Sequence, residues 1–120
     1  MLEYFKNVLI IAPHPDDETL GVGGTIKKLK KLNTKISLLV VGGHLPPLYS
    51  LNEYKKTENE CKKASKILGI KKIYFLKKIA TKFNEEPISE FNESISKIIN
   101  LINPDAIFIP FPDRHIDHRL

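Results

Sequence analysis

A short apolar run that ends in a crowded polar turn constrains this chain more than any other feature. Residues 8–11 read Val-Leu-Ile-Ile, and residues 12–18 continue as Ala-Pro-His-Pro-Asp-Asp-Glu. The apolar run predicts a buried strand, so His14, Asp16 and Asp17 follow directly after its end. Imidazole nitrogen and carboxylate oxygen are the usual non-sulfur ligands of Zn²⁺. The turn is therefore a candidate site for zinc or another divalent metal.

A second polar cluster lies near the other end of the chain. Residues 113–118 read Asp-Arg-His-Ile-Asp-His and come shortly after the apolar run Ala-Ile-Phe-Ile at 106–109. A three-ligand site needs a ligand from elsewhere in the fold, and this cluster can supply it.

Length and composition are those of an ordinary globular protein. The chain has 120 residues, of which 42% are hydrophobic and 28% charged, and this predicts one domain with one core. No apolar stretch approaches the length of a membrane span, and the first residues lack a signal-peptide layout. The single cysteine, Cys61, excludes an internal disulfide framework and a cysteine-based zinc site. We therefore expect a cytoplasmic protein.

The net charge of +5 allows two interpretations. A basic patch that binds nucleic acid is one, and solvated lysine-rich helix faces are the other. The chain has only two arginines, Arg114 and Arg119, whereas arginine is the residue expected where phosphates or bases are held in forked geometry. We favour solvated faces and expect no nucleic-acid partner.

Apolar runs and helical patterns alternate along the chain. Strands are predicted at 7–12, 35–41, 72–76 and 105–109. Helices are predicted at 18–32, 52–68 and 88–102, with Gly69 as the C-cap of the second and a loop over 77–87. This alternation predicts an α/β fold, a Rossmann-like three-layer α/β/α sandwich with a mainly parallel sheet in the order 3-2-1-4.

In that strand order the first and fourth strands are neighbours. Ligands bind at such a switch point, outside the carboxyl ends of the strands, so the two polar clusters are expected to converge there. Helix capping by the first cluster and a charged surface turn for the second are the alternatives. The joint placement of the two clusters favours a metal site.

Three residues of the two clusters form a plausible ligand set. His14, Asp17 and His118 would bind the metal and leave other positions open to water, as in catalytic rather than structural zinc sites. A zinc ion in such a site activates water near neutral pH.

The other polar residues of the clusters suit proton transfer. Asp16 is the candidate general base. His115 could stabilise an oxyanion or pass a proton to a leaving amine, and Asp117 could fix the tautomer and orientation of His115. The assembly suits the hydrolysis of an amide or ester. His44, in the loop after the second strand, and Cys61 are interpreted as an exposed loop residue and a packing residue.

The two clusters resemble the motifs of the LmbE/PIG-L family of zinc-dependent N-deacetylases. The Ala-His-Pro-Asp-Asp-Glu motif of that family is matched at 12–18, with one extra proline before the histidine, and residues 19–25 continue the likeness. The His-x-Asp-His motif is complete at 115–118. The resemblance implies zinc as the cofactor and, as substrate, an N-acetylglucosamine-type amide carried on a larger molecule. It also implies the same ligands, with Asp16 as base and His115 assisting.

The chain departs from the family pattern in one helix motif. In Arg-x-x-Glu-x-x-x-Ala, the chain matches at Glu60 and Ala64, but Thr57 stands in place of the arginine. Lys55 or Lys56 offers a substitute cation for holding the substrate.

Family domains continue well past the second motif, whereas this sequence ends at Leu120. The resemblance therefore predicts one LmbE/PIG-L-like domain over 1–120, incomplete at its C-terminus. An apolar face left uncovered after the fourth strand would favour self-association as a homo-oligomer.

The leading hypothesis is a zinc hydrolase that removes an acyl group from an amino-sugar conjugate. Two alternatives are a metal-dependent amidase acting on a non-sugar amide and a non-catalytic binding module that keeps the metal-bearing fold.

Overall fold

Four parallel strands form one sheet at the centre of the molecule. The computed structural model describes residues 5–14, 17–47 and 49–109, with the backbone alone for residues 17–22. The strands are β1 (Asn7–Ala12), β2 (Lys35–Gly43), β3 (Lys72–Ile79) and β4 (Ala106–Phe108). They lie in the order β3-β2-β1-β4, which confirms the predicted order 3-2-1-4.

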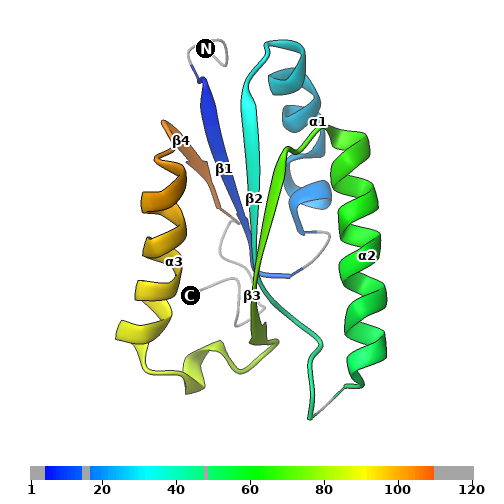
Figure 1. The fold of residues 1–120 in the computed structure, drawn as a ribbon, viewed down its shortest axis with the longest axis vertical. Coiled ribbons are helices and arrows are strands. Elements are labelled where there is room, and N and C mark those ends of the chain that lie inside the picture. Colours follow the sequence, from blue (N-terminus) through cyan, green and yellow to red (C-terminus); the bar gives the residue numbers. More distant parts are fainter. Residues whose placement is uncertain (1–4, 15–16, 48, 110–120) are drawn as a thin grey trace.

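Helices cover both faces of the sheet, as the three-layer prediction requires. The helices α1 (Asp17–Lys31) and α2 (Leu51–Leu68) lie on one face, and α3 (Ile88–Ile102) lies on the other (Figure 1). Ile26 of α1 and Cys61 of α2 belong to the core between the first two helices and the sheet. Phe91 of α3 belongs to the second core, with Leu9 and Leu39 of the sheet.

The central position of β1 explains why its sequence is apolar from Val8 to Ala12. Val8 and Ile10 point into one core and Leu9 into the other, and all three are at most 2% exposed. A parallel strand with helices on both faces is apolar on both faces, so it reads as a continuous run.

The end of α2 follows the predicted local chemistry. Gly69 has a φ of 87°, and its N–H donates to the carbonyl oxygens of Ser65 and Lys66. Left-handed backbone at a helix end favours glycine because it lacks a Cβ atom. The predicted C-cap is confirmed.

The region predicted as a loop over 77–87 begins instead with a continuation of β3, in which two more residues, Lys78 and Ile79, pair with β2. The register of β2 against β3 shifts between Val40 and Gly42, and Lys77 at the shift has a φ of 59°. Pairing then resumes between Gly42 and Lys78. The two adjacent lysines look like the end of a strand in the sequence, whereas in the structure Lys77 lies at a β-bulge and Lys78 resumes the pairing. A 3₁₀ helix, η2 (Phe83–Glu85), follows.

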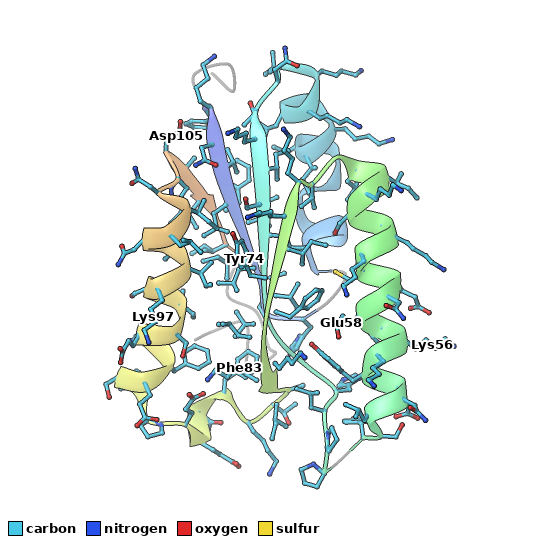
Figure 2. All side chains as sticks on the ribbon, in the orientation of Figure 1. Lys56, Glu58, Tyr74, Phe83, Lys97 and Asp105 are labelled. Carbon is cyan, nitrogen blue, oxygen red and sulfur yellow. The ribbon has the colours of Figure 1, made fainter. Side chains whose placement is uncertain are left out.

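A carboxylate ties the start of β1 to the start of β4. Asp105 accepts hydrogen bonds from the backbone N–H groups of Lys6 (2.8 Å) and Asn7 (3.2 Å). Its own N–H donates to the carbonyl oxygen of Asn7 at 2.9 Å. Figure 2 shows Asp105 at this end of the sheet. These bonds help to set β4 beside β1, and hence the direction in which the chain leaves β4.

We expect Asp105→Ala to lower the free energy of unfolding by about 1–3 kcal/mol, the usual cost of losing hydrogen bonds to a charged acceptor. Urea denaturation followed by circular dichroism measures this change. Glu93→Ala is the matched control, since it removes an exposed α3 carboxylate that only pairs with Lys97 across one helical turn. Such pairs contribute about 0.5 kcal/mol or less. Equal losses in the two variants would contradict the role of Asp105.

Candidate metal and catalytic site

The candidate site lies at the edge of the sheet where the parallel strands end. The backbone contact between β1 and β2 continues beyond Ala12, because the N–H of Gly42 donates to the carbonyl oxygen of Pro13 at 2.8 Å. His14 is the next residue. Helix α1 begins at Asp17, so four residues of the sequence separate it from β1.

The His14 side chain is only partly exposed. Its ring lies against the ring of Phe83, with a distance of 5.8 Å between the ring centroids and an angle of 37° between the planes. Phe83 is 3% exposed and in turn packs against Phe91 of α3, with centroids 5.5 Å apart. Figure 2 shows Phe83 beside the carboxyl end of β3.

Of the six residues predicted for the site, His14 alone has a described side chain. Asp17 is the first residue of α1, but only its backbone is described. Asp16 lies outside the described residues. The residues His115, Asp117 and His118 also lie outside the described ranges. The ligand set and the acid and base assignments therefore stay predictions.

The described residues and the predicted donors can be compared with the ligands that a zinc ion needs. Over residues 5–14, 17–47 and 49–109, no three His, Cys, Asp or Glu side chains are grouped closely enough to hold an ion. His14 offers a partly exposed imidazole at the strand edge, and the donors predicted to join it are a carboxylate and a second imidazole. This donor set fits zinc.

Phe83 is a functional candidate that sequence reasoning missed. It belongs to the segment predicted as a plain loop, and it lies far from His14 in the chain. The only sequence signal is a single aromatic side chain among polar neighbours, Thr81-Lys82-Phe83-Asn84-Glu85.

The interpretations of His44 as an exposed loop residue and of Cys61 as a packing residue are confirmed. His44 is exposed and stacks on Tyr49, with centroids 4.3 Å apart and planes at 24°. Cys61 is fully buried in the core between the sheet and helices α1 and α2.

Helix α2 carries the position where the family pattern has arginine. The hydroxyl of Thr57 donates to the carbonyl oxygen of Glu53 at 3.0 Å. Lys55 and Lys56 are exposed, and Figure 2 shows Lys56 on the outer side of the helix, away from the sheet. Lys56 is therefore poorly placed to replace the arginine.

A tyrosine of the same helix carries a perturbed acidity. Burial raises the pKa of Tyr54 to about 12, with smaller contributions from Glu58 and Cys61. The phenol is 2% exposed and neutral near pH 7, so Tyr54 acts as a core residue.

The lysines of the described helices are mostly exposed. In α1, for example, Lys27, Lys28 and Lys30 are all exposed. Within the described ranges, no helix combines the length and the apolar character needed to cross a membrane.

Known proteins resemble this chain over nearly its whole length. The profile of the PIG-L family, described as GlcNAc-PI de-N-acetylase, matches residues 9–120. Diacetylchitobiose deacetylase of Thermococcus kodakarensis is 32% identical over 133 aligned positions, which cover 95% of this chain and 45% of that protein. A probable N-acetyl-α-D-glucosaminyl L-malate deacetylase 2 of Bacillus anthracis is 31% identical, over 94% of this chain and 54% of its own length.

A solved structure agrees with these matches. N,N'-diacetylchitobiose deacetylase of Pyrococcus horikoshii superimposes with a TM-score of 0.81 at 35% identity, over 96% of this chain and 46% of that one. The chain thus spans about half the length of the relatives it matches. The resemblance inferred from the two motifs is confirmed, and the chain belongs to the PIG-L family of GlcNAc-PI de-N-acetylase-like proteins.

Proposed function

We propose that this protein is a zinc-dependent hydrolase that removes the N-acetyl group from an N-acetylglucosamine-type sugar conjugate. The observation that carries the proposal is the parallel pairing of β1 with β4, with Ile10 opposite Phe108. Because parallel strands end at the same edge of the sheet, β1 and β4 both end there shortly before a polar motif in the sequence. We therefore expect the two motifs to meet at that edge. The relatives named as deacetylases of amino-sugar compounds support the reaction and the substrate class.

In this proposal His14, Asp17 and His118 hold the metal. A bound zinc ion would polarise the amide carbonyl and increase the acidity of water. The partly exposed ring of His14 suits a ligand at an open site, since it is reachable from solvent and supported on one side by Phe83.

The remaining residues of the motifs move protons. Asp16 accepts a proton from the water molecule as its oxygen bonds to the carbonyl carbon. His115 donates a proton to the amide nitrogen as the carbon–nitrogen bond breaks, and Asp117 orients the His115 ring. The products are acetate and the free amine of the sugar.

Two alternatives use the same fold differently. A metal-dependent amidase would act on a non-sugar amide, and a binding module would bind metal or ligand without hydrolysis. An acetate-release assay over N-acetylglucosamine, diacetylchitobiose and N-acetylated non-sugar amines separates them. Release from the sugars alone supports the proposal, release from the non-sugar amides alone supports the first alternative, and metal binding without any release supports the second.

The ligand assignment predicts about one Zn²⁺ per chain and a steep loss of zinc in His14→Ala, Asp17→Ala and His118→Ala. Elemental analysis of the purified variants measures this loss. His44→Ala is the control, because it also removes an imidazole but one that is exposed and stacked on Tyr49. Unchanged zinc content in all three ligand variants would refute the assignment.

The base assignment predicts that Asp16→Asn keeps its zinc and loses hydrolysis about 10²–10⁴-fold, the usual effect of removing a general base. Zinc content and initial rates are measured on the same sample. If the variant instead loses its zinc, Asp16 is a ligand and its role must be exchanged with that of Asp17.

A further inference from the structure

We propose that Phe83 is a positioning residue that holds the His14 imidazole in its ligand orientation. This inference rests on the proposed function, because the orientation of His14 matters only if that ring binds the metal. Phe83 does not touch the reacting atoms in this proposal. It acts through His14.

The contact between the two rings is the first step of the argument. The ring centroids of His14 and Phe83 are 5.8 Å apart, and the planes are tilted by 37°. This separation lies in the range of favourable aromatic pairs. The metal-binding histidines of other proteins are commonly held by a second group on the ring, and here an apolar wall supports the ring from the side.

Phe83 can serve as a wall because it is itself immobilised by packing. It is 3% exposed and belongs to the core formed by β1, β2 and α3. The ring of Phe91 packs on it at 5.5 Å. The Phe83 ring also lies close to the backbone of Gly42, because a Cβ atom added to Gly42 would lie 2.6 Å from that ring. Phe83 therefore has little room to move.

The segment that carries Phe83 is also fastened to the sheet. The N–H of Ala80 donates to the carbonyl oxygen of Gly43 at 2.9 Å. The Nζ atom of Lys78 donates to a carboxylate oxygen of Glu86 at 2.6 Å, and both side chains are about three-quarters buried. This largely buried ion pair joins the residues on the two sides of η2, which fixes the place of Phe83 relative to β1.

The substitution Phe83→Leu tests the proposal, because leucine keeps an apolar side chain but removes the flat surface against His14. We expect zinc affinity, measured by competition with a chromophoric chelator, to fall by about 10-fold, the lower end of the range for residues that support a metal ligand. Phe75→Leu is the control, because it removes a ring that packs against the core on the other face of the sheet. It should change the affinity less than about 2-fold.

A second readout does not depend on the metal. In the metal-free protein, ¹³C relaxation of the His14 ring should report greater ring motion in Phe83→Leu than in Phe75→Leu. Should Phe83→Leu fail to fold, Glu86→Gln provides the test, since it removes the ion pair with Lys78 while leaving the core intact. It should lower zinc affinity and loosen the His14 ring in the same direction, by a smaller amount.

The outcomes separate this proposal from the proposed function. Equal effects of Phe83→Leu and Phe75→Leu on zinc affinity would overturn the positioning role, and so would no effect of either. If the unmodified protein takes up zinc but releases no acetate from any amide, the hydrolase assignment fails while the affinity comparison still decides the role of Phe83. If the unmodified protein takes up no zinc, both the metal site and the positioning role are refuted.

Discussion

The pairing of β1 on both of its edges is the constraint on which the rest of the structure depends. Six residues of β1 pair with β2, and three of them also pair with β4. Since both of its faces are covered by helices, the strand is apolar from Val8 to Ala12, and the next polar side chain appears only after its end. That side chain is His14, and it lies at the edge where every parallel strand of the sheet ends.

Gly42 joins three parts of this edge. Its N–H donates to Pro13, its backbone pairs with Lys78 of β3, and its missing Cβ leaves room for the Phe83 ring. A side chain here would collide with both the Lys78 carbonyl and that ring. The close approach of β2, β3 and η2 thus requires glycine at position 42. The same close approach allows the Phe83 ring to lie beside His14.

Most of the architecture could be predicted from local patterns. The strand at 7–12 and the helix at 88–102 match the structure at both ends, because uninterrupted apolar runs and helical periodicity are local signals. The extension of β3 beyond Leu76 could not be predicted in this way. It depends on a bulge at Lys77 that restores pairing with β2, and a bulge is stabilised by the partner strand rather than by its own sequence. For the same reason the sequence did not indicate that Phe83, in the predicted loop, packs beside His14.

The sequence by itself determined the fold class and the family, since periodicity and strand-end motifs are local features of consecutive residues. It also predicts the chemistry of the candidate site from the donor types in the two motifs. The identities of the ligands, the absence of a nucleic-acid partner, the cytoplasmic location and the homo-oligomer stay predictions from it. Only the tertiary structure decided which distant groups meet: Asp105 with the start of β1, and Phe83 with His14. Such contacts depend on strand order, register and loop closure together, and no local pattern in the chain encodes those.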